Sequence, residues 1–303
     1  MKVLNFGSLN IDNVYSVEHF VRGGETLSSE KMEVFSGGKG LNQSIALSKA
    51  LAGSGVTVYH AGAVGKEDGA FLLKQMEEAG VNVELTAQLP CKTGHAIIQR
   101  DKAGQNCILL YGGANQAITR EMADCVMEHF GEGDFLILQN EISQIGYIME
   151  TAHKKGMKIV LNPSPMDGKI GGYPLEYVDY FLLNEIEGAD ICGMAEAGDT
   201  TKEALLKGLA ERFPSAKIVL TLGGDGSLYK DGDMVLEQGI YKVPVVDTTA
   251  AGDTFTGYFI GGLVRGETAK EALDNGAKAA AIAVSRPGAA PSIPNREELA
   301  ENQ

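Results

Sequence analysis

The sequence lacks long apolar runs, paired cysteines and an excess of basic residues. No stretch approaches the roughly 18 apolar residues of a membrane-spanning helix, and Met1 to Leu9 lack the basic and apolar blocks of a signal peptide. We therefore expect a cytoplasmic protein with no membrane contact. The cysteines are few and widely spaced, without Cys-x-x-Cys metal spacing, so we expect reduced thiols rather than a disulfide scaffold.

Basic residues are scarce relative to acidic ones. The chain has 26 lysines and arginines against 40 aspartates and glutamates, which gives a formal net charge of −14. A surface of that sign repels a nucleic-acid backbone, so we expect no polynucleotide partner. A small anion such as a nucleotide stays open, because backbone amides or a bound cation can create a local positive site.

Two common nucleotide fingerprints are also absent. The P-loop spacing Gly-x-x-x-x-Gly-Lys-Ser/Thr does not occur, and no Gly-x-Gly-x-x-Gly follows the first predicted strand. A nicotinamide-dependent oxidoreductase is therefore a poor candidate. The five histidines show no ligand spacing, and we expect them to be structural or exposed.

What the chain does contain is typical of a globular α/β protein. Hydrophobic residues make up 44% of it and charged residues 22%. Apolar strand-like runs alternate with helical stretches, which predicts a mostly parallel sheet covered by helices on both faces. With no linker or internal repeat, we expect a single α/β domain over residues 1–303. The predicted strands are Lys2–Phe6, Val56–Val64, Phe135–Gln139, Lys158–Asn162, Tyr180–Leu183 and Lys217–Leu222.

Two stretches, residues 13–35 and 92–111, break this rhythm with short β-prone pieces and no convincing helix. In the second, Thr93–Arg100 half-alternates, a turn-prone Asp-Lys-Ala-Gly follows, and Cys107–Tyr111 is again strand-like, which predicts a hairpin. We expect the two stretches to pair as a small second sheet that forms a discontinuous lid.

The strongest chemical signal is a small-residue turn that opens a helix. Ala250, Ala251 and Gly252 leave the first amides of the helix uncovered, and these N–H groups with the helix dipole predict an anion cradle. Asp253 lies in the same turn, where it could accept a hydroxyl proton; a weak base suffices for the loose transition state of phosphoryl transfer. Taken alone, a capping role for Asp253 is an equally good explanation.

Other polar residues could bind a ligand with several hydroxyls. The glycine-rich segment Ser36–Gln43 precedes a helix and permits close backbone approach. Asn10, Asp12 and Glu141 follow predicted strands, where parallel sheets bind their ligands. Taken singly, a flexible glycine turn and ordinary turn or cap residues are simpler explanations.

Two more strand ends could line a nucleotide groove. Asn184 and Glu187 follow one predicted strand and offer oxygens near which a phosphate-bridging magnesium ion could sit. The glycine-rich turn Thr221–Gly226 follows the next strand. Ordinary β-turn chemistry explains its glycines equally well.

Together these motifs resemble the ribokinase family of sugar kinases, in order and over nearly the whole chain. Asp247–Phe255 resembles the C-terminal signature of the family, Gly37–Asn42 its N-terminal signature, and Gly112–Asn115 another stretch typical of ribokinases. The resemblance implies a three-layer α/β sandwich with a β-sheet lid, which also tends to form a dimer interface. It further implies transfer of the ATP γ-phosphoryl group to a sugar hydroxymethyl.

The resemblance also implies roles for individual positions. Asp253 would be the catalytic base, and Ala250, Ala251 and Gly252 would form the anion hole. The implied sugar contacts are Asn10, Asp12, Gly38, Lys39, Asn42, Ala96, Leu110, Glu141 and Asp253. The implied nucleotide side is Asn184, Glu187, Thr221, Gly223, Gly226 and Gly252, with Glu187 at the position associated with magnesium. The implied ligands of a monovalent cation, expected to be potassium, are Asp247, Thr249, Ala283, Arg286, Gly288 and Ser292.

The leading hypothesis is an ATP-dependent kinase that converts D-ribose to ribose 5-phosphate. Leu41 and Ser44 stand where ribokinases usually have alanine, which leaves the substrate less certain than the reaction. Fructose, deoxyribose, 2-keto-3-deoxygluconate and adenosine are alternative substrates. A non-catalytic sugar-sensing protein on the same fold is a further alternative, but the intact set of Asp253 and residues 250–252 favours catalysis.

Overall fold

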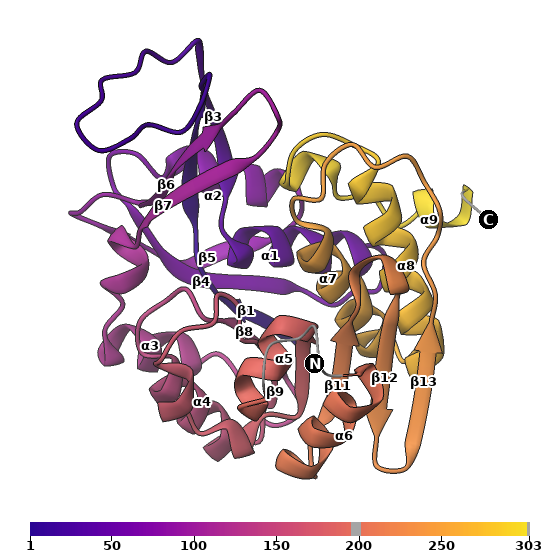
Figure 1. The fold of residues 1–303 in the computed structure, drawn as a ribbon. Coiled ribbons are helices and arrows are strands. Elements are labelled where there is room, and N and C mark those ends of the chain that lie inside the picture. The colour runs from indigo at the N-terminus through magenta and orange to yellow at the C-terminus, as the bar shows by residue number, and fades with distance from the viewer. Residues whose placement is uncertain (195–200, 302–303) are drawn as a thin grey trace.

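A sheet of nine strands forms the centre of the computed structural model, which describes residues 1–194 and 201–301 (Figure 1). The strand order is β13-β12-β11-β10-β9-β8-β1-β4-β5, and β12 and β13 run antiparallel at one edge of an otherwise parallel sheet. The strands are β1 (Val3–Phe6), β4 (Val58–Gly65), β5 (Asn82–Leu89), β8 (Phe135–Gln139), β9 (Lys158–Asn162), β10 (Tyr180–Asn184), β11 (Lys217–Thr221), β12 (Ser227–Asp231) and β13 (Met234–Gln238).

The predicted α/β class is therefore confirmed, and so are the six predicted strands, within two residues at each end. Three strands were not predicted: β5, β12 and β13. β5 and β13 are the two edge strands, and β12 lies next to β13; the sequences of all three mix apolar and polar residues instead of forming a continuous apolar run. A continuous apolar run in the sequence therefore does not identify strands of this kind.

Helices cover the sheet on both faces and complete three layers (Figure 1). Apolar side chains of α1, α2, α7 and α8 form one core with one face of the sheet, and those of α3, α4, α5 and α6 form a second core with the other face. The helices are α1 (Lys39–Ala50), α2 (Ala70–Glu78), α3 (Arg120–Met127), α4 (Ile145–Lys154), α5 (Glu185–Cys192), α6 (Lys202–Arg212), α7 (Ala251–Val264), α8 (Ala269–Val284) and the short α9 (Glu298–Glu301).

Helix α7 is buried on almost all sides because it packs against both α1 and α8. Its contact with α1 is close: a Cβ on Gly257 would lie 2.3 Å from the Cβ of Ala46, and one on Gly261 would lie 2.6 Å from the Cβ of Ala50. Glycine on one helix and alanine on the other allow this approach. The packing brings the N-termini of α1 and α7 together at the carboxyl ends of the central strands.

A second sheet of four strands projects from the main body, in the order β3-β2-β6-β7 (Figure 1). These strands are β2 (Asn10–Ser16), β3 (Lys31–Gly37), β6 (Gly94–Arg100) and β7 (Asn106–Tyr111). The hairpin between β6 and β7 turns at Asp101, whose Oδ1 accepts from the amides of Ala103 and Gln105, each at 2.9 Å. We call this second sheet the lid. Among the described residues, no helix is long and apolar enough to cross a membrane.

Candidate active site

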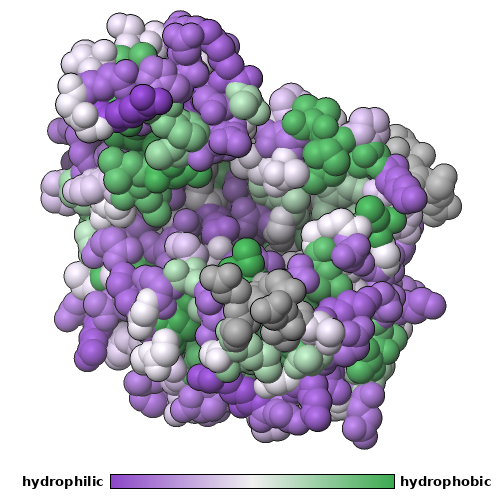
Figure 2. Space-filling view, viewed as in Figure 1, coloured by the Kyte–Doolittle hydropathy of each residue, from purple (hydrophilic) through white to green (hydrophobic). Residues whose placement is uncertain are grey.

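The candidate residues meet where the lid joins the carboxyl ends of the central strands. Figure 2 shows a hollow between the lid and the main body, with hydrophilic residues on its floor. Helices α1 and α7 begin here, and β8 and β10 end here. This is the edge at which parallel sheets bind ligands, because the loops that follow the strands converge there.

Asp253 lies in the first turn of α7 and is 7% exposed. The Nδ2 group of Asn42 donates to its Oδ2 at 3.0 Å, and the Nε2 group of Gln43 donates to its Oδ1 at 2.9 Å. Both donors come from consecutive residues of α1. The carboxylate is thus held at both oxygens, and each oxygen keeps lone pairs with which to accept a proton.

The turn before Asp253 presents open amides. Ala250 has a left-handed conformation with φ of 60°, which is uncommon for a residue with a side chain. This turn directs the amide of Ala251 to the carbonyl of Thr248 at 3.2 Å, while the amides of Gly252 and Asp253 have no acceptor within the described chain. A Cβ on Gly252 would meet open space. Two unpaired N–H groups at a helix N-terminus form a receptive site for an anion.

The glycines at the start of α1 permit close packing. A Cβ on Gly37 would lie 2.1 Å from a carboxylate oxygen of Asp12, and one on Gly40 would lie 2.3 Å from the amide nitrogen of Ser8. Gly38 has φ of 95°, which glycine adopts without strain. The start of α1 therefore lies directly against the β1–β2 connection, and the simpler interpretation as a loose turn is wrong.

Asp12 and Glu141 are two carboxyl groups whose negative charges interact. Burial and the neighbouring Glu141 raise the pKa of Asp12 to about 6. Burial also raises the pKa of Glu141, against hydrogen bonds from the Ser8 hydroxyl and from the Lys39 amide, the latter at 3.0 Å. Ser8 lies in the β1–β2 connection, so Glu141 is tied to both the sheet and α1.

Lys39 supplies the positive charge at the centre of the site. Burial alone would lower the pKa of its side chain, but Asp253, Glu141 and Glu187 surround it and raise its pKa above the ordinary value. The lysine therefore stays charged, and it offers three donors to an anionic or hydroxylated ligand.

Asn10 is the first residue of β2 and is 4% exposed. The Nδ2 group of Asn115 donates to its Oδ1 at 2.8 Å, and Asn115 also exchanges two hydrogen bonds of 3.1 Å with the backbone of Leu9. The Nδ2 group of Asn10 keeps no partner among the residues that the structure describes. Asn10 and Asp12 were expected to be turn or cap residues when taken singly; both instead lie in a strand of the lid.

The lid brings two further predicted residues next to Asp12. In the strand register, Asp12 pairs with Ala96, and Ala96 pairs with Leu110. The three side chains therefore share one face of the lid. Ala96 is 3% exposed and Leu110 is 47% exposed, so the apolar contact predicted from the lid lies within reach of the carboxyl pair.

The structure gives Asn184 and Glu187 a capping role at the start of α5. The Asn184 side chain accepts from the Glu187 amide at 2.9 Å, and one oxygen of Glu187 accepts from the Asn184 amide at 3.0 Å. Glu187 is buried and still faces Lys39 across the site. Its other carboxylate oxygen has no partner in the described part of the chain and can receive a ligand.

On the neighbouring strand, the turn after β11 is tightly built. Thr221 donates to the Leu183 carbonyl at 3.2 Å, and the Leu222 amide donates to the Gly226 carbonyl at 2.8 Å. Gly223 and Gly226 both have positive φ, and a Cβ on Gly226 would lie 2.1 Å from the Gln238 carbonyl oxygen. The glycines are thus required by the turn itself, whatever else they contact.

The residues proposed around a cation lie in two loops beside the anion cradle. Asp247 accepts from the amide and hydroxyl of Thr249 at 2.9 and 2.6 Å, and from the amide of Gly288 at 3.0 Å. These hydrogen bonds lower the pKa of Asp247 although burial opposes them. The remaining positions lie in the last turn of α8 and in the segment after it: the Ala283 carbonyl accepts from the Arg286 amide, and the buried Ser292 hydroxyl donates to the Ala289 carbonyl.

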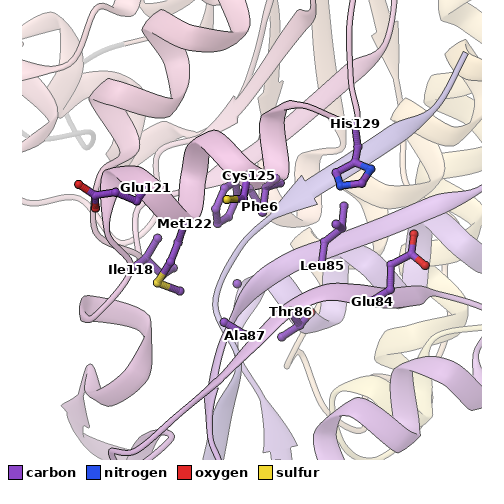
Figure 3. Close-up of a pocket in the computed structure, with 12 residues that line it drawn as sticks. Phe6, Glu84, Leu85, Thr86, Ala87, Ile118, Glu121, Met122, Cys125 and His129 are labelled. Carbon is purple, nitrogen blue, oxygen red and sulfur yellow. The ribbon is translucent and has the colours of Figure 1, made fainter.

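Two cavities elsewhere contain none of the candidate residues. One, of about 410 Å³, lies between α3 and the strands β4 and β5, of which β5 is the edge strand. In Figure 3, Met122 and Cys125 lie on the helix side of this cavity, and Leu85 and Thr86 lie on the strand side. The other, of about 620 Å³, lies between α6 and the β12–β13 hairpin. Neither combines a base, a charged lysine and open amides.

Comparison with known proteins agrees with this geometry. Residues 1–296 match the model of the pfkB family of carbohydrate kinases. The chain belongs to this family. It is 34% identical to a Staphylococcus aureus ribokinase over 306 residues, covering 98% of each chain, and 32% identical to a Schizosaccharomyces pombe ribokinase over 309 residues, covering 99% of this chain and 96% of the relative.

The fold of this carbohydrate kinase is also that of solved ribokinases. A structure of Arabidopsis thaliana ribokinase complexed with ribose and ATP superposes with a TM-score of 0.87 at 28% identity, covering 99% of this chain and 98% of the other. The three-layer sandwich with a smaller β-sheet is therefore shown by structure as well as by sequence.

Three residues of the kinase site carried no predicted role: Ser8, Gln43 and Asn115. Gln43 and Asn115 lie inside motifs that the sequence made conspicuous, and Ser8 lies two residues before the predicted contact Asn10. All three are buried and polar, and each hydrogen-bonds a predicted site residue. A polar residue beside a candidate residue, in a segment expected to be buried, was the available signal.

Replacing Asp12 by asparagine is predicted to stabilise the unliganded protein. The pKa of Asp12 is about 6 in the folded protein against 3.8 ordinarily. Ionisation therefore costs stability that is fully felt above about pH 6 and fades as the pH falls towards 3.8. Urea unfolding should show Asp12→Asn more stable than the parent by on the order of 1 to 3 kcal/mol at pH 8, and by less at pH 5. The exposed Asp233→Asn is the control, and equal gains at both pH values would contradict the prediction.

Proposed function

We propose that this kinase transfers the γ-phosphoryl group of ATP to the hydroxymethyl group of D-ribose and forms ribose 5-phosphate. One observation carries the proposal. Asp253, held at both carboxylate oxygens, lies in the same helical turn as two amides without acceptors. A base and an anion site at adjacent positions are what phosphoryl transfer to a hydroxyl requires.

A small sugar suits the polar groups left without partners. Asn42 donates to Asp253, but its own Oδ1 is buried and has no partner among the described residues. The free Nδ2 group of Asn10 supplies donors, and Asp12 and Glu141 supply acceptors. Each sugar hydroxyl needs such a partner, because leaving one buried and unpaired costs about 1 to 3 kcal/mol. Ala96 and Leu110 would cover the apolar side of the ring.

In the proposed reaction, Asp253 accepts the proton of the attacking hydroxyl as the new oxygen–phosphorus bond forms and the bond to ADP breaks. The amides of Gly252 and Asp253 stabilise the charge on the migrating phosphoryl group, because they already point at its position before reaction. Lys39 adds a positive charge between the base and the sugar-side carboxylates. The nucleotide would extend over the Thr221–Gly226 turn.

The residues present also fit a magnesium ion that accompanies ATP. Magnesium prefers carboxylate oxygens and often keeps several waters, so one carboxylate near the phosphates is sufficient. Glu187 offers one free oxygen there, while its other oxygen and the Asn184 side chain fix its orientation. When bound, the ion neutralises phosphate charge.

The Asp253→Asn variant is predicted to lose phosphoryl transfer while it still binds sugar. Asparagine keeps the shape of the side chain but cannot accept the hydroxyl proton. ADP release in a coupled assay should fall by at least about 10³-fold, and calorimetry should show sugar binding within a few-fold of the parent. Substantial turnover by the variant would remove Asp253 as the base.

The same assay on the parent separates the candidate substrates. Ribose should give the highest kcat/KM in a panel with fructose, deoxyribose, 2-keto-3-deoxygluconate and adenosine. A different preference would keep the kinase and change its substrate. Sugar binding without ADP release from any substrate would favour the sugar-sensing alternative.

We further propose that a potassium ion binds beside the anion cradle and activates the enzyme. Asp247 already links the loop before Ala250 to the loop after α8, and the surrounding groups are carboxylate, carbonyl and hydroxyl oxygens, the ligands that hard cations use. An ion bound to Asp247, Thr249, Ala283, Arg286, Gly288 and Ser292, largely through carbonyls, would hold the following amides in their receptive orientation.

Removal of potassium should therefore lower kcat severalfold or more. The measurement is ADP release in potassium and in choline chloride at equal ionic strength, with ribose and ATP saturating. Thermal unfolding in the same two buffers shows whether the fold is intact in both. Equal rates in the two salts would exclude the activating ion.

We also propose that two copies associate through their lids. β7 is an edge strand whose six residues are all exposed, and Ile108 and Leu109 are 60% and 68% exposed. Apolar residues gather on the lid in Figure 2. An exposed apolar edge of this kind is costly in water and suited to pairing with a second chain.

Leu109→Asp is predicted to convert a dimer of the 32.1 kDa chain to a monomer, because a charge would be buried in the apolar contact. Sedimentation velocity at micromolar concentration measures the change. The control is Val235→Asp, which adds the same charge to an exposed edge strand of the central sheet and should leave the mass unchanged. A parent protein that sediments as a monomer would overturn the association.

A further inference from the structure

A line of buried amide side chains leads from Asp253 into the core of the protein. The Nε2 group of Gln43, besides its bond to Asp253, donates to Asn162 Oδ1 at 3.1 Å, and Gln43 Oε1 accepts from Gln139 Nε2 at 2.7 Å. The same Gln139 nitrogen donates to Asn5 Oδ1 at 2.9 Å. Asn5, Gln43 and Gln139 are fully buried, and they come from β1, α1 and β8.

The inner end of this line has only one possible orientation. Asn5 Nδ2 donates to the backbone carbonyl of Gly40 at 2.7 Å, and a carbonyl can only accept. The Asn5 oxygen must therefore face Gln139, so Gln139 must present its nitrogen to both neighbours. In the observed orientation, Gln139 Oε1 is buried without a partner among the described residues. Reversing either amide would in addition place two donors or two acceptors against each other, at a cost of about 1 to 3 kcal/mol for each further unpaired group.

The orientation of the amides at the outer end, those of Gln43 and Asn162, is fixed in the same way. Because Gln139 Nε2 donates to the Gln43 oxygen, that oxygen faces Gln139. The Gln43 nitrogen therefore faces Asp253 and Asn162. Asn162 is itself oriented, since its Nδ2 group donates to the Leu182 carbonyl at 3.0 Å and its oxygen therefore faces Gln43. Every hydrogen of the Gln43 amide thus has a fixed acceptor.

This arrangement affects the rotation of the Asp253 carboxylate. A carboxylate held at one oxygen can turn about its Cβ–Cγ bond, and the terminal torsion of aspartate is broad. The Asn42 donor at Oδ2 and the Gln43 donor at Oδ1 hold both ends, so the plane of the carboxylate is fixed. A base with a fixed plane keeps its free lone pairs directed at the bound hydroxyl.

We propose that Gln43 is a positioning residue for phosphoryl transfer, oriented through Gln139 and Asn5 so that its amide nitrogen fixes the Asp253 carboxylate. The inference rests on the proposed role of Asp253 as the base. Gln43 acts through Asp253 and lies behind it, so its contribution belongs to the chemical step and not to the binding of sugar or ATP.

The first test compares kcat and KM in Gln43→Met and Gln43→Glu. Methionine keeps the length of the side chain and removes both donors, whereas glutamate keeps the acceptor for Gln139 and places a second carboxylate against Asp253. Both variants should lose kcat by on the order of 10- to 100-fold, as misplacement of a reacting group does, with the KM values for sugar and ATP within about twofold of the parent.

The second test asks whether Gln139 acts through Gln43. Gln139→Leu alone should lower kcat severalfold, because the Gln43 oxygen then loses its donor and the amide is held only from the side of Asp253 and Asn162. Added to Gln43→Met, the same change should lower kcat no further, since no oriented amide remains to be disturbed. Multiplying losses in the double variant would overturn the connection between the two residues.

Ser48→Ala is the matched control, because Ser48 lies on the same helix and donates to the Ala79 carbonyl at 2.8 Å, away from the site. It should lose a comparable hydrogen bond and keep its kcat. Circular dichroism and thermal unfolding identify the folded fraction of each variant, to which the rates are normalised. Folded Gln43 variants with kcat within twofold of the parent would overturn the inference. If the parent transfers no phosphoryl group, or Asp253→Asn keeps its rate, the proposed function fails instead.

Discussion

The site depends on the close approach of α1 and α7 at their N-termini. Asn42 and Gln43 reach the two oxygens of Asp253 only because no side chain separates the helices: glycine on α7 faces alanine on α1, and Gly40 lets α1 lie against the backbone at Ser8. Apolar packing of the two helices thus sets the geometry of a polar contact. A displacement of α7 relative to α1 would therefore move the Asp253 carboxylate away from its two donors by the same distance.

The structure also shows how a chain with a net charge of −14 can receive an anion. Positive groups in the site are the open amides of Gly252 and Asp253 at the N-terminal end of α7 and the side chain of Lys39. A helix N-terminus carries about half a positive charge. Three carboxylates around Lys39 keep its side chain protonated, and their negative charges limit its positive potential to the site. The local arrangement of these groups therefore decides whether an anion can bind, and the net negative charge of the protein does not prevent it.

Much of this could be predicted from sequence because it depends on local patterns. The central strands are continuous apolar runs, and the small-residue turn before Asp253 indicates an open helix start, although the amide of Ala251 donates to the Thr248 carbonyl and is not open. Asn10 and Asp12 were harder, because their strand in the lid is defined by β3 and β6, which are distant in sequence. The amides of Asn5 and Gln139 were visible as polar residues in apolar strands, but only the fold shows that they share a hydrogen bond.

The first residues of the lid strands β2 and β6 lie in the candidate active site. Asn10 is the first residue of β2 and pairs with Gly94, the first residue of β6, and Asp12 lies two residues further along the same strand. Groups that would touch the sugar thus lie at the base of the four paired strands of the lid. With seven residues in β2 and about 3.3 Å per residue, the lid extends roughly 20 Å beyond its base. A tilt of about ten degrees at the base would displace the far end by about 3 to 4 Å over that length, so a small adjustment around a bound sugar would become a larger displacement at the outer rim of the lid.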